Sequence, residues 1–515
     1  MLVAMLAAAC TESTPNSPAP APAETATAET NDGGAPSGDR RGMTGESAGA
    51  AGTSAESEAV ASRVREWMAQ LSVEQKARLV SGSRGDAESL EQNLDRVPGS
   101  AGYTVALPEL GIRDTVLADG PAGLRILPQR DNDDATYYAT AFPVATALAS
   151  TWDVELVEQV GVAMGEEIRE YGVDVFLAPG MNLHRNPLGG RNFEYFSEDP
   201  LLSGAMAAAV VNGVESNGVG ATIKHYFANN QETNRQLIDT LINERTLREI
   251  YLRGWEVAVE RSQPWAIMSA YNQVNGSPVS ESHELLTTVL RDEWGFEGVV
   301  MTDWFAGDDP IAQMKAGNNL LMPGVPERSD AIRRALETGE LTEAELDVNV
   351  ERILTMVARS RSQHGYAYSN APDLESNAAT ARAAAAEGTV LLKNEGAVLP
   401  LTDDERSIAA FGATSYSFIA GGSGSGDVNE AYTVSLVQGL EEAGFEIDAV
   451  LAQTYAEYRT VEEARLPVPE FFFELVPLIP EMPLDAETIL KSVSKTGRLL
   501  IVDETFAPCL SLIHI

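Results

Sequence analysis

Residues 298–307, GVVMTDWFAG, constrain the fold more than any other stretch of this sequence. The apolar run at 299–301 is typical of a buried strand, and it stops abruptly at Thr302, Asp303 and Trp304. A strand that ends in a carboxylate and an aromatic is how a (β/α) barrel presents a catalytic group at its C-terminal rim. Asp303 alone could equally cap a helix or hold a loop. The segment therefore predicts a parallel α/β sheet, and the role of Asp303 depends on what the other strands carry.

Short β-rich runs alternate with amphipathic helical patterns through most of the chain. Repeated strand–helix units of about 40 residues predict a parallel sheet, and this many units predict a closed barrel. A second α/β region opens with an Ala-rich helix and the apolar strand TVLL, and it reaches the loop GGSGSGD. The expected fold class is therefore α/β, with a (β/α)8 TIM-like barrel followed by a further α/β domain. The predicted barrel strands lie in TVLADG, VDVFLAP, GATIKHY, WAIMSAYN, GVVMTDW and NNLLMPG, and the predicted helices include 152–171, 243–262 and 282–294.

Changes in composition divide the chain into segments. An apolar start that ends in small residues before Cys10 predicts a signal with lipid on Cys10, or else an ordinary cleaved signal. We therefore expect an exported protein, either periplasmic or anchored to a membrane by that lipid. The Ala-, Ser-, Thr- and Pro-rich stretch that follows cannot bury enough apolar surface to fold, which predicts a disordered tether. The expected boundaries are 1–10 for the signal, 11–56 for the tether, 57–361 for the barrel, 362–378 for a linker, 379–490 for the second domain and 491–515 for an atypical tail.

Charge and composition exclude several functional classes. A formal net charge of −40 argues against nucleic acid and anionic lipid as partners, because both repel a polyanion. The 2 cysteines, Cys10 and Cys509, cannot build a disulfide framework or a cysteine metal site. The 5 histidines form no HxH or HExxH pair, which argues against a His-ligated metalloenzyme. No metal or organic cofactor is implied by the sequence. The strongly negative net charge favours a neutral or cationic small molecule as substrate.

Polar or aromatic side chains follow five consecutive predicted strands. Because the carboxyl ends of parallel strands meet at one rim, these groups should converge on a common site. Each residue also has an ordinary explanation: Asp119 could form a turn, Lys224 could lie in solvent, and His225 could be a satisfied core residue. The convergence of the whole set favours a site. The residues are Asp119, His184, Lys224 with His225, Tyr271 with Asn272, and Asp303 with Trp304.

Two loops between these elements are also candidates. Arg191 lies in GGRNFEYFSED, and its fixed fork of donors suits vicinal hydroxyls, although Glu194 or Glu198 could pair with it instead. The loop GGSGSGD is interpreted first as a flexible loop. A phosphate-binding loop would place Lys after the glycines, and Asp427 stands there.

Several of these segments together resemble a known family. LADGPAGLR, GRNFEYFSEDP, IKHYFANNQE, IMSAYNQVNG and GVVMTDWFA look like glycoside hydrolase family 3, close to its bacterial β-glucosidases. AAAEGTVLLKNEGAVLPL resembles the start of that family's second domain, an α/β sandwich. The likeness extends over residues 64–460.

The resemblance implies a retaining, exo-acting β-glucosidase that removes terminal β-D-glucosyl residues from oligosaccharides or glucosides. Asp303 would be the nucleophile of such an enzyme. The loop after Lys224 and His225, YFANNQETNR, lacks the His that characterises the family's N-acetylglucosamine branch. By the same resemblance, the sugar subsite would consist of Asp119, Arg125, Arg191, Lys224, His225, Arg235, Met268, Tyr271 and Trp304.

The acid/base glutamate of the family is not identified in this sequence. In the glucosidase branch it follows a strand that should lie near or beyond residue 500, within a Gly-rich turn that the sequence lacks. Glu504 follows the strand LLIV, but we do not assign it this role. The second domain is thus expected to be a truncated sandwich, and a non-catalytic or impaired sugar-binding lipoprotein is an alternative. A Schiff-base lyase using Lys224 is another.

Overall fold

The described chain begins with two helices, α2 (Ser54–Met68) and α3 (Val73–Leu79). A capping box begins α3: Gln75 N–H donates to the Ser72 hydroxyl at 3.2 Å, and Ser72 N–H donates to the Gln75 side chain at 2.9 Å. Cys10, Glu504 and the predicted tether up to residue 53 lie outside the described residues. The computed structural model describes residues 54–83, 97–130, 133–395, 399–401, 406–420, 422, 424–466 and 500–501.

The principal sheet has six strands among the described residues, in the order β1-β2-β3-β4-β6-β9. β2, β3, β4, β6 and β9 run parallel, and β1 pairs antiparallel with β2 at one edge. The parallel strands are apolar and almost wholly buried, as expected where helices cover a sheet on both faces. The bounds are β1 (Gly102–Tyr103), β2 (Val116–Asp119), β3 (Val175–Leu177), β4 (Gly220–Tyr226), β6 (Ala266–Ser269) and β9 (Val299–Thr302).

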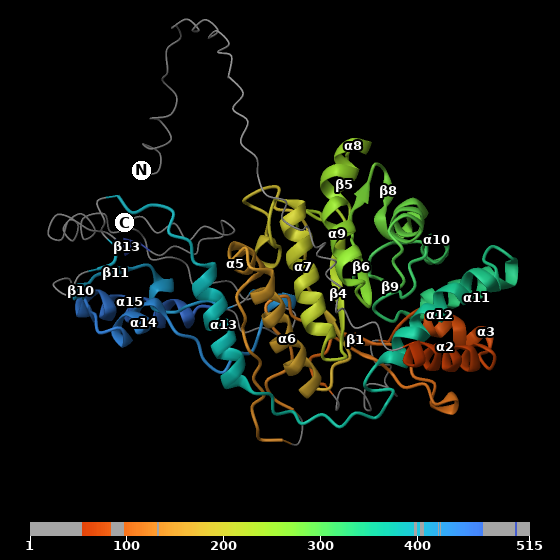
Figure 1. The fold of residues 1–515 in the computed structure, drawn as a ribbon, viewed down its shortest axis with the longest axis horizontal. Coiled ribbons are helices and arrows are strands. Elements are labelled where there is room, and N and C mark those ends of the chain that lie inside the picture. The colour runs from red at the N-terminus through yellow and green to blue at the C-terminus, as the bar shows by residue number, and fades with distance from the viewer. Residues whose placement is uncertain are drawn as a thin grey trace, which may run out of the picture. The chain divides into compact units, whose positions relative to one another are not determined.

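Helices connect these strands in the places that the sequence pattern predicts. Asp153 caps one helix and Asp199 the next, each by accepting backbone N–H bonds from the first turn. These two helices, α6 and α7, lie side by side (Figure 1), and a Cβ at Gly213 would stand 2.2 Å from the carbonyl oxygen of Glu158. The bounds are α5 (Ala145–Ser150), α6 (Val154–Glu170), α7 (Pro200–Glu215), α8 (Glu244–Thr246), the π-helix η3 (Leu247–Tyr251), α9 (Arg253–Ser262), the π-helix η5 (Glu284–Glu293), α10 (Pro310–Ala316), α11 (Pro326–Thr338) and α12 (Glu343–Arg359).

Successive side chains of each strand enter two different cores. Val116 and Ala118 of β2 belong to a cluster that includes Val210 of α7. Leu117, between them, belongs to a second cluster with Leu354 of α12. The two-residue period of a strand therefore explains the near-continuous apolar sequence, because both faces of the sheet are packed.

The expected eight-stranded closed barrel is not what the described residues form. The sheet is barrel-like but open, and NNLLMPG supplies only a single parallel bridge between Met301 and Leu320. The side chain of Asn319 explains the loss of this strand. Its Oδ1 accepts the Val300 N–H at 2.8 Å, a donor that a neighbouring strand would otherwise take.

Shorter elements surround the principal sheet. A small sheet on the rim consists of strands of two residues each, and 3-10 turns stand in several loops. These elements are β5 (Asp239–Thr240), β7 (Gln273–Val274), β8 (Ser277–Pro278), η1 (Pro108–Leu110), η2 (Asn192–Glu194) and η4 (Val279–Glu281).

Helix α13 (Leu374–Gly388) begins within the predicted linker 362–378. It packs against the first domain, since Asn377 donates a 2.9 Å hydrogen bond to Glu167 of α6, and Ala384 belongs to the same cluster as α6 and α7. The expected strand TVLL directly after it is not a strand. Leu391 and Leu392 are 58% and 85% exposed, and no described strand lies beside them to pair with.

The second region contains two parallel strand pairs with helices. β10 pairs with β12, and β11 pairs with β13. A small core forms around Phe411, Leu451 and Tyr455, so an α/β unit is present as expected. The bounds are β10 (Ser407–Ile408), β11 (Ala410–Phe411), η6 (Ala413–Ser415), η7 (Gly424–Gly426), α14 (Leu436–Glu442), β12 (Glu446–Ile447), α15 (Ala449–Glu463) and β13 (Leu500–Ile501).

Candidate active site

The carboxyl ends of β2, β4, β6 and β9 carry most of the predicted site residues. Parallel pairing of these strands through β3 brings the ends to one edge of the sheet. The loops that follow β2, β3 and β4 add three arginines to the same edge. The strand-end residues are Asp119, Lys224, His225, Met268, Tyr271, Asp303 and Trp304, and the loop residues are Arg125, Arg191 and Arg235.

Lys224 of β4 and Asp119 at the end of β2 form a largely buried ion pair, with β3 between the two strands. Nζ of Lys224 donates to Oδ1 of Asp119 at 3.1 Å, and the two side chains are 2% and 17% exposed. Arg125 adjoins this pair, because its backbone N–H donates to the Asp119 carbonyl at 2.9 Å and its side chain is buried. Burial lowers the pKa of Arg125, while the charge of Asp119 opposes that shift. Charged donors and an acceptor thus meet at the carboxyl ends of the strands.

His225 is enclosed by hydrogen-bonding groups. One guanidinium nitrogen of Arg191 lies 2.9 Å from Nε2, and the Tyr195 hydroxyl and Asn182 Oδ1 each lie 3.3 Å from Nδ1. Asn182 also fixes the backbone of His225, accepting its N–H at 2.8 Å and donating to its carbonyl at 2.9 Å. Burial lowers the pKa of His225 well below its usual value, and the positive charges of Arg191 and Lys224 lower it further. The imidazole is therefore neutral.

Asp303 directly follows β9 and is 8% exposed. Its Oδ1 accepts a 2.7 Å hydrogen bond from the Trp304 N–H, and its Oδ2 lies 3.6 Å from Nε2 of His225. Burial raises the pKa of Asp303, and the charges of Arg191 and Lys224 act in the opposite direction. A carboxylate that is poorly hydrated yet surrounded by cations can remain ionised and attack an electron-poor carbon.

Tyr271 and Arg235 stand beside the carboxylate. The guanidinium of Arg235 lies 4.7 Å above the Tyr271 ring and forms a 2.9 Å ion pair with Glu232. Burial raises the pKa of the Tyr271 hydroxyl, and the charge of Asp303 raises it further, so this hydroxyl stays protonated. It can therefore act as a hydrogen-bond donor next to Asp303.

Trp304 and Met268 are the two apolar residues of the predicted sugar subsite that flank its polar groups. The indole N–H of Trp304 donates to the carbonyl of Ala101 at 3.2 Å, which fixes the ring at the rim. Met268 is 2% exposed and belongs to the hydrophobic cluster on the α12 face of the sheet. The structure thus places Met268 beneath the site and Trp304 at its edge.

His184, a strand-end candidate, braces a loop. Its Nε2 lies 2.9 Å from the carbonyl oxygens of both Asn192 and Tyr195, so it can hold the turn that carries Arg191. Sequence reasoning did not single out Asn182 or Tyr195, which contact His225. The only signal was the position of Asn182 two residues before His184, in the same polar segment after β3.

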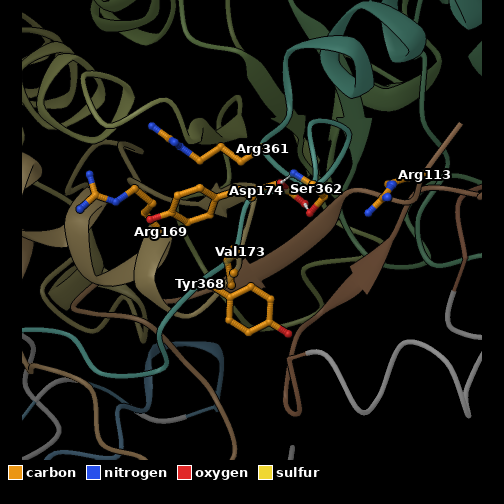
Figure 2. Close-up of a pocket in the computed structure, with 10 residues that line it drawn as sticks. Arg113, Arg169, Val173, Asp174, Arg361, Ser362 and Tyr368 are labelled. Atoms are coloured by element: carbon orange, nitrogen blue, oxygen red, sulfur yellow. Dashed lines mark hydrogen bonds between the residues drawn. The ribbon is translucent and has the colours of Figure 1, made fainter.

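A cavity of about 140 Å³ lies at the opposite, amino-terminal end of the strands. Asp174, which precedes β3, accepts hydrogen bonds there from the N–H of Val116 at 2.9 Å and from the N–H of Ser362 at 2.8 Å. Figure 2 shows Arg113 and Arg361 on opposite sides of this cavity, without converging on a common point. The hydrogen bonds of Asp174 therefore hold the chain after α12 against the amino-terminal end of the sheet.

Two further observations concern cofactors and membranes. Among the residues that the structure describes, no group of three or more His, Cys, Asp or Glu could hold a metal ion. In that part of the chain, no helix is both long and apolar enough to cross a membrane.

Comparison with protein families gives two matches. A model described as the glycosyl hydrolase family 3 N terminal domain matches residues 114–356. A model described as the glycosyl hydrolase family 3 C-terminal domain matches residues 389–489.

Individual proteins agree with these matches. The chain is 41% identical over 391 residues to thermostable beta-glucosidase B of Acetivibrio thermocellus, covering 74% of this chain and 48% of the relative. It is 40% identical over 394 residues to an exo-alpha-(1->6)-L-arabinopyranosidase of Bifidobacterium longum, covering 73% and 49%. The chain therefore spans about half the length of these curated relatives. The solved structure of beta-glucosidase 3B from Thermotoga neapolitana in complex with glucose superposes with a TM-score of 0.79 at 50% identity, covering 86% of this chain and 62% of that chain.

Proposed function

The chain belongs to glycoside hydrolase family 3, and from this premise we propose that it hydrolyses terminal β-D-glucosyl residues of oligosaccharides or glucosides with retention of configuration. The observation that carries the proposal is the desolvated carboxylate of Asp303, placed at a strand end beside Lys224, Arg191 and His225. No metal or organic cofactor takes part in the proposed reaction.

In the proposed mechanism, an oxygen of Asp303 forms a bond to the anomeric carbon while the glycosidic C–O bond breaks. The departing oxygen takes a proton from an acid, and water then hydrolyses the glycosyl-enzyme with that residue acting as base. The Asp119–Lys224 pair, Arg125 and Arg191 offer charged hydrogen bonds to ring hydroxyls. The acid/base residue is unassigned, and Glu504 is outside the described residues.

A mechanism-based label tests the nucleophile directly. 2,4-Dinitrophenyl 2-deoxy-2-fluoro-β-D-glucoside should form a stable covalent adduct, which mass spectrometry of peptides should locate on Asp303. A label on another residue would overturn the assignment. Binding of glucose without labelling or turnover of the aryl glucoside would favour the alternative, a non-catalytic sugar-binding protein.

The sugar specificity needs its own comparison, because one relative is named an arabinopyranosidase. An α-L-arabinopyranoside lacks the hydroxymethyl group of a glucoside and carries the 4-hydroxyl in the opposite orientation. We propose that the 4-nitrophenyl β-D-glucoside has the higher kcat/KM. A higher kcat/KM for the 4-nitrophenyl α-L-arabinopyranoside would reverse the preference while leaving the reaction class intact.

We also propose export of the chain with lipid attached to Cys10, a residue outside the described part. The support is the apolar run of small residues before it, followed by a tether-like composition. The Cys10→Ser variant should leave the membrane fraction and appear soluble in the periplasm. Continued membrane association of that variant would refute the lipid anchor.

A further inference from the structure

Gly422 and residues 424–429 of the second region, together called segment 422–429, lie against two loops of the candidate site. A Cβ at Gly422 would stand 2.2 Å from the ring of Phe193, two residues after Arg191. A Cβ at Gly426 would stand 2.9 Å from the same ring and 3.5 Å from Pro121, which follows β2. The glycines of this segment are therefore required for close packing on the rim, beyond giving the loop flexibility.

The contact continues beyond Asp427, at Val428 and Asn429. Val428 is 3% exposed and belongs to the hydrophobic cluster of the first domain. Asn429 accepts a 3.0 Å hydrogen bond from the Ala139 N–H and donates one of 2.8 Å to the Tyr137 carbonyl. One backbone and one side-chain hydrogen bond, together with apolar burial, thus fix the position of the segment, and with it the position of Asp427.

We propose that Asp427 is a positioning residue for the sugar site, holding the Arg125 guanidinium beside Asp119 across the contact between segment 422–429 and the rim loops. The proposal rests on the proposed function. It assigns to the second region a carboxylate that affects how tightly a glucosyl group binds, acting through Arg125.

The charges around Arg125 support this arrangement. Arg125 is 3% exposed, and the carboxylates of Asp119 and Asp427 both oppose the lowering of its pKa by burial. Arg125 in turn opposes the rise that burial causes in the pKa of Asp427. Neighbouring groups partly enclose Asp427, but the residue keeps an exposed surface, so its interaction with Arg125 is partly screened by solvent. The expected effect is therefore modest and sensitive to salt.

The test compares Asp427→Asn with a matched control, Glu430→Gln, in the full chain. Glu430 is three residues along the same segment, and its charge does not act on Arg125. At low salt, Asp427→Asn should raise KM for an aryl β-glucoside and Kd for glucose by about three- to five-fold, with kcat nearly unchanged. Glu430→Gln should change neither constant, and Asp427→Glu should recover part of the loss.

Two further measurements show whether Asp427 acts through its charge on Arg125 or only supports the local structure: the dependence on salt, and the effect of Asp427→Asn when Arg125 is also replaced. The difference between wild type and Asp427→Asn should shrink between about 0.05 and about 1 M NaCl, because the carboxylate of Asp427 is exposed to solvent and its charge is screened by salt. Asp427→Asn should have no further effect in an Arg125→Met background. Equal constants for Asp427→Asn and Glu430→Gln, or a salt-independent difference, would overturn the proposal. A wild-type chain that neither binds glucose nor hydrolyses the glucoside would overturn the proposed function itself, and this inference with it.

Discussion

Arg191 donates a hydrogen bond of 2.9 Å to Nε2 of His225, and this bond decides which tautomer the imidazole adopts. A guanidinium carries only donors, so Nε2 must accept and the ring proton must reside on Nδ1. His225 therefore presents no N–H to Oδ2 of Asp303, 3.6 Å away. The ring is a neutral neighbour of the carboxylate, and the nearby positive charge comes from Arg191 and Lys224.

Replacing Arg191 by Lys should disturb this arrangement. A single ammonium cannot reproduce the fork that contacts both Glu194 and His225, so kcat/KM should fall by about 10- to 100-fold. Burial is the main cause of the low pKa of His225 and lysine keeps a positive charge beside it, so the pKa should stay low and the acid limb of the pH–rate profile should keep its shape. Arg185→Lys, on the exposed part of the same loop, is the control. Equal losses in both variants would contradict the role of Arg191.

Asp303→Asn should abolish glycosyl-enzyme formation without lowering Tm. Burial raises the pKa of Asp303, so the ionised carboxylate is disfavoured in the folded protein, and neutralising it should leave stability equal or slightly higher. Differential scanning calorimetry and labelling by the fluoro-glucoside measure the two effects. Asp308→Asn, an exposed carboxylate on the same loop, should keep full labelling. A large drop in Tm for Asp303→Asn would show that the charge has a structural role.

Lys224→Met should weaken transition-state binding by about 2–4 kcal/mol, since it removes a charged donor and leaves Asp119 without its 3.1 Å partner. The measurement is kcat/KM for the aryl glucoside. The same residue tests the Schiff-base alternative, because borohydride should not trap substrate on Lys224 if it acts only as a hydrogen-bond donor. Unchanged kcat/KM, or a trapped adduct, would reject this interpretation.

The parts of the fold and site that the sequence predicts are those encoded locally. Short apolar runs followed by Asp119, by Lys224 or by Thr302 and Asp303 indicate parallel strands and their carboxyl ends, because strand, turn and helix signals are short-range. The open sheet was not predictable in this way. Asn319 replaces a strand partner through one side-chain hydrogen bond, which looks the same in a sequence as an Asn at the start of a strand.

The features of the site that the sequence did not predict are contacts between residues far apart in the chain. Arg191 and His225 are 34 residues apart, and Asn182 and His225 are 43 apart, so neither partner is marked by spacing or composition. The loop around Asp427 has the composition of a flexible linker, yet it packs on Phe193 because its glycines leave room for the ring. Such pairings depend on the folded arrangement and are read only from the structure.

Glu215, at the end of α7, should make stability fall as pH rises. Its carboxylate accepts the backbone N–H groups of Ala221 at 3.1 Å and Trp265 at 2.8 Å, and burial raises its pKa to about 8, well above the usual value of 4.5. Between these two values the folded state retains a proton that the unfolded state has lost. The free energy of unfolding should therefore decrease by about 1 kcal/mol per pH unit over this window.

Glu215→Gln keeps an oxygen that can accept both backbone bonds but carries no titrating group. Urea unfolding of this variant between pH 5 and 8 should lose the downward slope that the wild type shows, and at pH 8 the variant should be the more stable protein. Glu158→Gln, an exposed carboxylate on the adjoining helix α6, should keep the wild-type slope. A Glu215→Gln slope equal to that of wild type would mean that the carboxylate ionises normally, with solvent reaching it between α7 and the start of β4.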